Sequence, residues 1–179
     1  DNKCADEIIV GIRELLRSFK LHPYDEGTER GFLRHVLVRV GKNTGEILVT
    51  LVGGNSMFPK KHDFVKALVK RFPDITTVTF SVNRTPEMLL LGENNEVLYG
   101  EGYITDILCG KRFRISPHSF YQINHAQTEK LYDYAIKAAK LTKKDVLLDA
   151  YSGIGTIGII ASDYVKQVQG CLLYTSPSP

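Results

Sequence analysis

The chain has 179 residues, of which 43% are hydrophobic and 24% charged, and its formal net charge is +3 with an isoelectric point near 8.7. This composition is typical of a folded globular protein and excludes a disordered chain, a collagen-like repeat and a disulfide-rich scaffold. The mild positive charge is compatible with a nucleic-acid partner without requiring one, because the charges are spread along the sequence.

The three cysteines give no sign of a metal site or a disulfide framework. Cys4, Cys109 and Cys171 are far apart in the sequence, and their number is odd. No signal peptide is visible, and no apolar run approaches the ~20 residues of a membrane span. We therefore expect a protein of the reducing cytoplasm, with no membrane partner and no metal.

Residues 1–115 are predicted to form an α+β domain, with helices on one face of an antiparallel sheet. Two stretches have apolar residues at helical spacing, whereas the others alternate or are rich in β-branched residues, as strands are. Turns that contain glycine join several of the strands into hairpins. In chain order the predicted elements are a helix at 5–20, strands at 32–40 and 47–51, a helix at 61–72, and strands at 75–82, 88–91, 97–99, 103–108 and 111–115.

A second domain is predicted to begin with the loop at 116–124 and a long helix at 126–139. Asn124 precedes this helix and is its expected N-cap. The face of the helix that we expect to point inward carries Leu131, Tyr134, Ala135 and Ala138.

The loop before this helix allows two interpretations. Gln122 can hydrogen-bond a ligand, because its amide is both a donor and an acceptor. Alternatively, Phe120 and Tyr121 are core residues and Gln122 caps backbone groups. The residue types do not decide between the two.

The rest of the second domain is organised around residues 146–158. The apolar run 146–148 indicates a buried parallel strand, and Asp149 ends it. A tight glycine turn and the start of a helix follow, and residues 165–168 are expected to form the next strand. A strand, a glycine loop and a helix N-terminus together form the usual cradle for a nucleotide-like ligand.

Three interpretations of this loop are open. Gly153, Gly155 and Gly158 match the dinucleotide fingerprint, but a carboxylate beside a pyrophosphate would repel it. Asp149 suits a cationic ligand better, such as the ammonium-bearing tail of S-adenosylmethionine, and Asp-x-x-x-Gly-x-Gly is the first motif of class I methyltransferases. A plain strand-to-helix turn that binds nothing is the third interpretation. We favour S-adenosylmethionine.

Four stretches identify a family when they are read together. They are Arg34–Arg39, Thr44–Glu46, Ile115–Asn124 and Asp149–Gly155. Together they resemble the RNA uracil-C5 methyltransferases, most of all the bacterial 23S ribosomal RNA branch, over about residues 5 to 170. The Ser-Phe-x-Gln-x-Asn stretch is far more specific than the glycine loop. The resemblance implies that S-adenosylmethionine is contacted by Gln122, Tyr151, Asp149, Gly153 and Gly155.

The resemblance also implies a reaction. In this family a cysteine thiolate adds to C6 of uracil, so that C5 attacks the donor methyl group, and a base then removes the C5 proton. None of the three cysteines stands in the family's catalytic context, and the glutamate base has no counterpart. The acidic residue that follows the family's second strand is missing too, as are its N-terminal RNA-binding barrel and iron–sulfur site. We therefore assign no catalytic residue to this chain.

The expected organisation is that of a fragment. A doubly wound domain needs more than about 100 residues, and a sheet that begins near residue 145 cannot be completed by residue 179. We expect an α+β domain at 1–115, the truncated start of a Rossmann-like class I methyltransferase domain at 116–170, and a non-native tail at 171–179. The intact protein is expected to methylate 23S ribosomal RNA, and this chain to be inactive. The alternatives are a tRNA uridine-C5 methyltransferase and an NAD(P)-dependent oxidoreductase.

Overall fold

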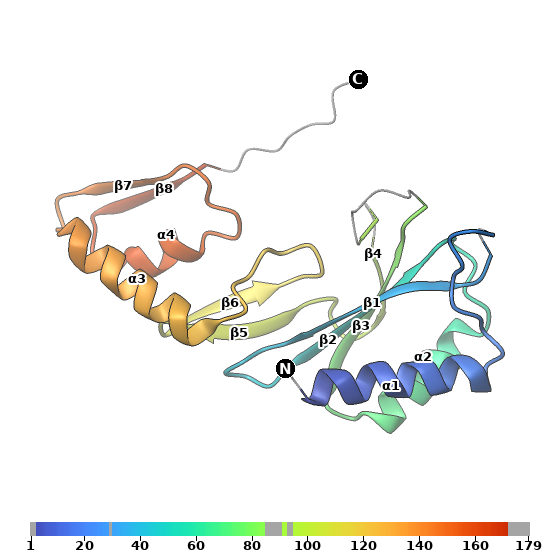
Figure 1. Ribbon diagram of the computed structural model, residues 1–179. Coiled ribbons are helices and arrows are strands. Elements are labelled where there is room, and N and C mark those ends of the chain that lie inside the picture. The colour runs from blue at the N-terminus through green and yellow to red at the C-terminus, as the bar shows by residue number, and fades with distance from the viewer. Residues whose placement is uncertain (1–2, 29, 85–90, 93–94, 172–179) are drawn as a thin grey trace, which may run out of the picture. The chain divides into compact units, whose positions relative to one another are not determined.

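The computed structural model describes residues 3–28, 30–84, 91–92 and 95–171 (Figure 1). They divide into two compact units. The first runs to Asp106 and includes Arg114–His118, and the second consists of Ile107–Phe113 and the chain from Ser119 onward. The domain boundary predicted between residues 115 and 116 stays a prediction.

A four-stranded sheet organises the first unit, in the order β1-β2-β3-β4. The strands are β1 (Leu33–Val40), β2 (Ile47–Gly53), β3 (Ile75–Val82) and β4 (Asn95–Tyr99). The β1–β2 pair is antiparallel, as predicted, and so is the β3–β4 pair, whereas β2 and β3 are parallel. The parallel pair arises because α2 (Lys61–Arg71) connects these two strands, and parallel strands need such a crossover.

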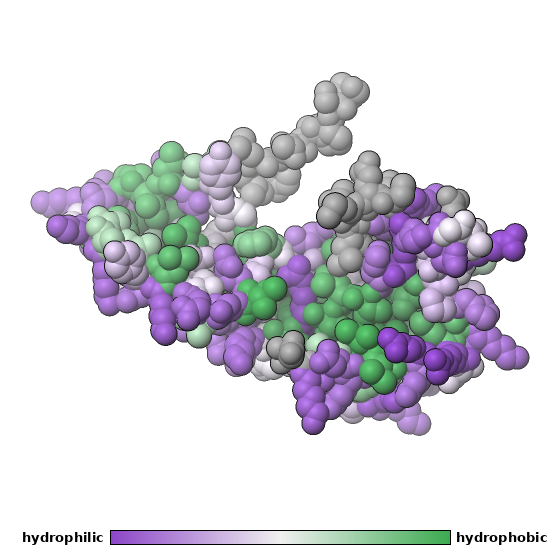
Figure 2. Space-filling view, viewed as in Figure 1, coloured by the Kyte–Doolittle hydropathy of each residue, from purple (hydrophilic) through white to green (hydrophobic). Residues whose placement is uncertain are grey.

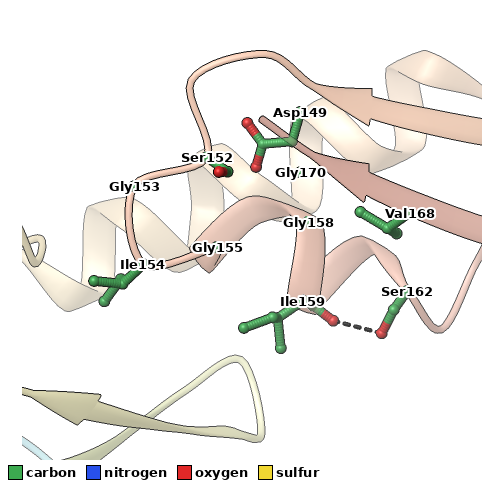
Figure 3. A pocket seen from close by; sticks show the side chains of 10 residues that line it. All are labelled: Asp149, Ser152, Gly153, Ile154, Gly155, Gly158, Ile159, Ser162, Val168 and Gly170. Carbon is green, nitrogen blue, oxygen red and sulfur yellow. Dashed lines mark hydrogen bonds between the residues drawn. The ribbon is translucent and has the colours of Figure 1, made fainter. Parts of the chain in front are cut away.

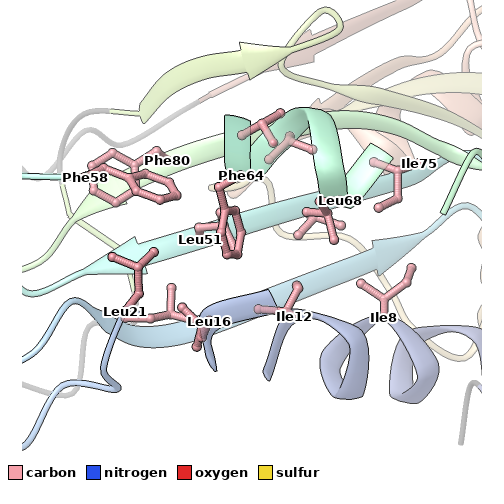
Figure 4. Packing of buried hydrophobic residues seen from close by; sticks show 14 of the residues in the cluster. Ile8, Ile12, Leu16, Leu21, Leu51, Phe58, Phe64, Leu68, Ile75 and Phe80 are labelled. Atoms are coloured by element: carbon pink, nitrogen blue, oxygen red, sulfur yellow. The ribbon is translucent and has the colours of Figure 1, made fainter. Parts of the chain in front are cut away.

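Two helices cover one face of this sheet. α1 (Lys3–Ser18) contributes Ile8, Ile12 and Leu16 to the core, and α2 contributes Phe64 and Leu68 (Figure 4). These side chains recur every three or four residues, so each helix presents a continuous apolar face to the sheet. Strand β2 is buried along its whole length, and the core of the first unit is centred on it.

The turn between β1 and β2 is fastened to β5 (Ile104–Leu108), which pairs with β6 (Lys111–Ile115) in a separate two-stranded sheet. The fully buried carboxylate of Asp106 accepts hydrogen bonds from the backbone N–H groups of Lys42 and Asn43, at 3.0 and 2.9 Å. Each buried hydrogen bond of this kind contributes roughly 1–2 kcal/mol. The base of the β5–β6 hairpin is therefore held within the first unit.

The second unit contains the predicted strand–loop–helix–strand order. Its elements are α3 (His125–Ala139), β7 (Val146–Asp149), α4 (Thr156–Ala161) and β8 (Gln167–Gly170). β7 and β8 are parallel, and α4 contacts both. The second strand begins two residues later than predicted, at Gln167 rather than 165.

The prediction that β7 is a buried strand is wrong for this chain. Val146 and Leu148 are 53% and 65% exposed, and Figure 2 shows apolar side chains at the surface over β7 and β8. A parallel strand is fully buried when helices cover both faces of its sheet. Within the described residues β7 has one neighbouring strand, and its outward side chains are uncovered.

The prediction for the inward face of α3 is wrong as well. Leu131 and Tyr134 are 60% and 73% exposed. The side chains that point inward are His125, Thr128, Tyr132 and Ile136. Tyr132 and Ile136 pack against a cluster formed by the tip of the β5–β6 hairpin and by α4. Both faces of α3 carry apolar residues at helical spacing, so the sequence pattern alone does not identify the inward one.

Some predictions fall outside the described residues. The strand predicted at 88–91 lies almost wholly there, and so does the predicted tail beyond Cys171. Within the part of the chain that the structure describes, no helix has both the length and the apolar character needed to cross a membrane.

Candidate functional site

A pocket of about 450 Å³ lies at the C-terminal ends of β7 and β8 (Figure 3). Asp149 and Gly170 line it from the strands, the glycine loop lines it from one side, and α4 contributes Gly158 and Ile159. Ligands of open α/β sheets bind at this edge, outside the carboxyl ends of the strands. The position of the pocket is therefore that of a nucleotide-like binding site.

The backbone of the glycine loop requires the glycines predicted there. Gly153 and Gly155 have φ values of 52° and 80°, in the left-handed region that side chains disfavour. Hydrogen bonds then fix the loop to the chain that follows β8. The Ser152 N–H donates to the Cys171 carbonyl at 3.1 Å, and the Cys171 N–H donates to the Asp149 carbonyl at 2.8 Å.

Asp149 places a carboxylate in this pocket, and one of its oxygens lacks a partner. Its Oδ2 atom is buried and has no hydrogen-bond partner among the described residues. A Cβ atom at Gly158 would lie 3.3 Å from this oxygen and 3.0 Å from the Val168 side chain, so glycine leaves the carboxylate its space. Burying a carboxylate oxygen without a donor is costly. The site is therefore suited to a ligand that brings a cationic or N–H donor group.

Gln122 and Tyr151 lie outside the set of residues that line the pocket. The Tyr151 side chain is 86% exposed. Gln122 is half-buried and lies near Tyr132, whose pKa it lowers. The structure thus brings Asp149, Gly153 and Gly155 together in one pocket, and it brings neither Gln122 nor Tyr151 into the lining of that pocket.

Tyr132 connects Gln122 with the neighbourhood of Asp149, and sequence reasoning missed it. Burial raises the pKa of Tyr132, the nearby Gln122 side chain lowers it, and Cys109 and Asp149 raise it. Both Gln122 and Asp149 therefore lie near this phenol. The signal that could have found Tyr132 is its helical spacing from His125 and Thr128, since all three point inward from α3.

The structure bears on the core interpretation of the 116–124 loop, and the ligand-binding role of Gln122 stays a prediction. Tyr121 is partly buried and packs against the core cluster of the second unit, with its ring 6.1 Å from the ring of Phe113. Phe120 is 74% exposed and is not a core residue. Asn124 is the N-cap of α3 as predicted, and its side chain accepts a hydrogen bond from the Gln127 N–H at 3.3 Å.

Cys109 lies at the tip of the β5–β6 hairpin, and its surroundings disfavour a nucleophile. Burial raises the pKa of its thiol, and the carboxylates of Glu129 and Asp133 raise it further. A thiol with a raised pKa is mostly protonated at neutral pH and reacts slowly. Among the described residues, no group of three or more histidine, cysteine or acidic side chains is arranged to hold a metal ion.

Comparison with known proteins identifies relatives along almost the whole chain. An uncharacterized RNA methyltransferase of Oceanobacillus iheyensis is 38% identical over 169 residues, which are 94% of this chain and 37% of that protein. Those of Halalkalibacterium halodurans and Lactococcus lactis are 40% and 42% identical, each over 92% of this chain and 36% of its own length. The chain thus spans a little over a third of the length of these relatives. No protein-family profile matches it.

A solved structure has the same fold. It is the Pyrococcus abyssi tRNA (uracil-54, C5)-methyltransferase in complex with S-adenosyl-L-homocysteine, with a TM-score of 0.72 and 27% identity. The match covers 94% of this chain and 39% of that one. It confirms the predicted fold class, a mixed α/β fold with a methyltransferase-like structural neighbour.

Proposed function

Because the chain belongs to the same family as these RNA methyltransferases, we propose that its second unit binds S-adenosylmethionine and that the whole protein methylates C5 of uridine in RNA. The observation that carries the proposal is the buried, unpartnered Oδ2 atom of Asp149 in a glycine-lined pocket. The ammonium group of the methyl donor supplies the hydrogen-bond donor and the positive charge that this oxygen lacks.

The residues of the pocket fit such a ligand better than a dinucleotide. A pyrophosphate beside Asp149 would meet a negative charge at close range and be repelled. Gly153 and Gly155 let a ligand lie close to the main chain, since they have no Cβ atom in its way. The oxidoreductase alternative is therefore disfavoured by the same carboxylate that favours the cation.

The proposed roles follow from these positions. S-adenosylmethionine supplies an electrophilic methyl group when it is bound. Asp149 binds its ammonium group, Gly153 and Gly155 accommodate it against the backbone, and the Gln122 amide offers it a hydrogen bond. Tyr151 presents an exposed aromatic face, which attracts a sulfonium cation. The cysteine that adds to uracil C6 and the glutamate base are proposed to lie in the part of the relatives' length that this chain does not span.

The proposed target is 23S ribosomal RNA, on the strength of the sequence resemblance of the 115–124 and 149–155 stretches. A tRNA is the second candidate, because the similar Pyrococcus abyssi enzyme is named for a tRNA uracil. A cytoplasmic location accords with either RNA and with the three free cysteines. Competition between labelled 23S ribosomal RNA and tRNA in a filter-binding assay distinguishes them, and preferential retention of tRNA would reject the ribosomal target.

Replacing the carboxylate tests the methyl-donor site. Titration of the ¹⁵N-labelled chain with S-adenosylhomocysteine, followed by NMR, is expected to give saturable shifts in the wild type. The affinity is expected to be low, since the residues that hold the adenosine in this family are missing here. In Asp149→Asn the affinity should fall at least roughly tenfold, because a charge-assisted hydrogen bond is worth about 1.5–3 kcal/mol.

Two controls test whether the loss of affinity is caused by the missing charge at Asp149. Asp133→Asn removes an exposed carboxylate that pairs with Lys137 on α3, and it should leave the affinity unchanged. Adenosine lacks the ammonium group, so its weaker binding should be equal in the wild type and in Asp149→Asn. Equal affinity of the wild type and Asp149→Asn for S-adenosylhomocysteine would reject the proposed role of this carboxylate.

The proposal also predicts that the chain alone transfers no methyl group. None of its cysteines stands in the catalytic sequence context of the family, and the pKa of Cys109 is raised by burial. Incubation with tritiated S-adenosylmethionine and either RNA should leave the RNA unlabelled. Label in ribosomal RNA would show that catalytic groups are present in this chain after all.

A further inference from the structure

The segment Arg114–His118 belongs to the first unit and is held by both outer strands of its four-stranded sheet. On one side, Arg39 of β1 donates a hydrogen bond from its Nη2 atom to the Pro117 carbonyl at 3.0 Å. On the other side, the ring of His118 contacts the side-chain amide of Asn95 of β4 through its Nε2 atom. Side chains of β1, of β4 and of this segment are therefore neighbours within the first unit.

Arg39 is a cation that has no acidic partner among the described residues. It alternates along β1 with Val38 and Val40, which pack against the helix-covered core, so its side chain points to the opposite face of the sheet. The Nε–H group is buried without an acceptor in the described part of the chain, and burial lowers the pKa of the half-buried guanidinium. Such a group gains from an anion, because charge-assisted hydrogen bonds are the strong ones.

Arg114 is a second cation without a paired carboxylate among the residues that the structure describes, and an aromatic ring orders it. Its guanidinium carbon lies 4.8 Å from the centroid of the Tyr103 ring. The turn before this tyrosine is fixed to β3, since the Gly102 N–H donates to the Thr77 hydroxyl at 2.8 Å. Arg114 is exposed, and an arginine that is ordered in advance loses less entropy when it binds a ligand.

We propose that Arg39, Arg114 and Tyr103 form a contact surface for single-stranded RNA on the first unit. The choice of RNA rests on the proposed function. Guanidinium groups bind phosphate oxygens, and an unpaired base stacks on the plane of a guanidinium or an aromatic ring. Pro117, which Arg39 contacts, is three residues from Arg114 and so at most about 11 Å away. One RNA strand can therefore place phosphates at both cations and a base on the stack of Tyr103 and Arg114.

A salt series tests the phosphate contacts. The affinity of the 179-residue chain for a fluorescein-labelled oligouridylate is measured by fluorescence anisotropy between about 50 and 200 mM salt. Arg39→Gln and Arg114→Gln should each weaken binding about three- to tenfold at the lower salt concentration. Each should also make the slope of log affinity against log salt less steep by about 0.7, the contribution of one phosphate on a single strand.

Arg114→Lys tests the stack separately, because it keeps the charge and removes the planar group. It should weaken binding at least about threefold and leave the salt slope unchanged. The matched control is Arg13→Gln, which removes an exposed arginine from α1, on the helix-covered side of the sheet. It should change the affinity less than about twofold and leave the slope as it is. Because Arg114 is exposed, its variants should fold even if Arg39→Gln does not.

The outcomes separate this surface from the methyl-donor site. Equal losses in Arg39→Gln, Arg114→Gln and Arg13→Gln would reject the surface, because RNA would then respond to net charge alone. Absence of binding to the wild type, or equal displacement of the RNA by polyglutamate, would reject it as well. S-adenosylhomocysteine titration of the same variants should match the wild type. If the wild type does not bind S-adenosylhomocysteine while the RNA variants behave as expected, the methyl-donor proposal fails and the RNA surface stands.

Discussion

Glycines with the same backbone requirement occur both inside and outside the candidate site. Gly153 has φ 52° and lines the pocket, whereas Gly45 has φ 75° in the turn between β1 and β2. A Cβ atom at either position would meet no described atom within 4 Å. Substitutions at the two positions can therefore be compared. The comparison separates the loss of stability caused by a side chain in the left-handed region from any effect of that side chain on ligand binding.

Alanine at each of these glycines should cost a similar amount of stability and have different effects on binding. Both Gly153→Ala and Gly45→Ala are expected to lose about 1–2 kcal/mol of unfolding free energy in urea titrations. Only Gly153→Ala should also weaken S-adenosylhomocysteine binding, because its methyl group occupies space next to the ligand. Equal affinities for the two variants would argue against a ligand at the glycine loop.

The thiol of Cys109 should have an unusual pH dependence. Its pKa is raised by burial and by Glu129 and Asp133, so its thiolate forms at higher pH than that of an ordinary cysteine. Alkylation by iodoacetamide, followed by peptide mass spectrometry, should therefore reach half its maximal rate at a higher pH for Cys109 than for free cysteine under the same conditions.

Removing the negative charge of Glu129, one of the two carboxylates that raise the pKa of Cys109, should lower that pKa. Glu129→Gln should move the Cys109 profile to lower pH, while the glutamine oxygen can still accept the backbone hydrogen bond from Cys109. The exposed Glu101→Gln serves as the control and should leave the profile unchanged. A midpoint for Cys109 at or below that of free cysteine would contradict the account.

How well the sequence predicts individual residues depends on how local their interactions are. Asp149, Gly153 and Gly155 are close in sequence, so a strand followed by a tight turn was bound to bring them together. Tyr132 lies near Gln122 and comes from the next helix, so finding it requires knowing which face of that helix turns inward. The orientation of the Tyr151 side chain also depends on tertiary packing, and a local sequence pattern does not predict such packing.

At the scale of elements, α3 illustrates a choice that sequence periodicity leaves open. Leu131 and Ile136 are both apolar, and each belongs to a stripe with helical spacing. The tip of the β5–β6 hairpin, distant in sequence, packs against Ile136 and so selects that stripe. Helices and strands were predictable because their patterns are local, whereas the inward face of α3 and the parallel β2–β3 pair depend on distant segments.

Truncation of the two side chains tests which stripe is buried. Ile136→Ala should lower the unfolding free energy by about 1–3 kcal/mol, because it removes packed methyl groups. Leu131→Ala, at a position that is 60% exposed, should change it by less than about 0.5 kcal/mol. Urea titrations measure both, and a larger loss for Leu131→Ala would show that the helix is turned the other way.

At the scale of the whole molecule, the two units have unequal cores. The core of the first unit contains buried residues from two helices and three strands, including the fully buried Leu51, Phe64 and Val78. In the second unit Val146 and Leu148 of β7 are more than half exposed, and the buried cluster around Leu108 is small. Stability follows buried apolar area, so it should differ between the units.

Hydrogen exchange should reveal this difference. Amides of β2 and β3 are expected to exchange only on global unfolding, whereas those of β7 and β8 should exchange by local opening at lower free energy. Mass spectrometry of peptides from each strand measures both rates in one sample. Equal protection of β2 and β7 would mean that the two units unfold as one.

The central claim is that the pocket at the ends of β7 and β8 binds a cationic methyl donor, and glycine-selective ¹⁵N labelling tests it most directly. Titration with S-adenosylhomocysteine should shift the amide signals of Gly153, Gly155 and Gly170 in a saturable way, while Gly41 and Gly45 stay in place and NADH has no such effect. Signals that respond to NADH and not to S-adenosylhomocysteine would contradict the account.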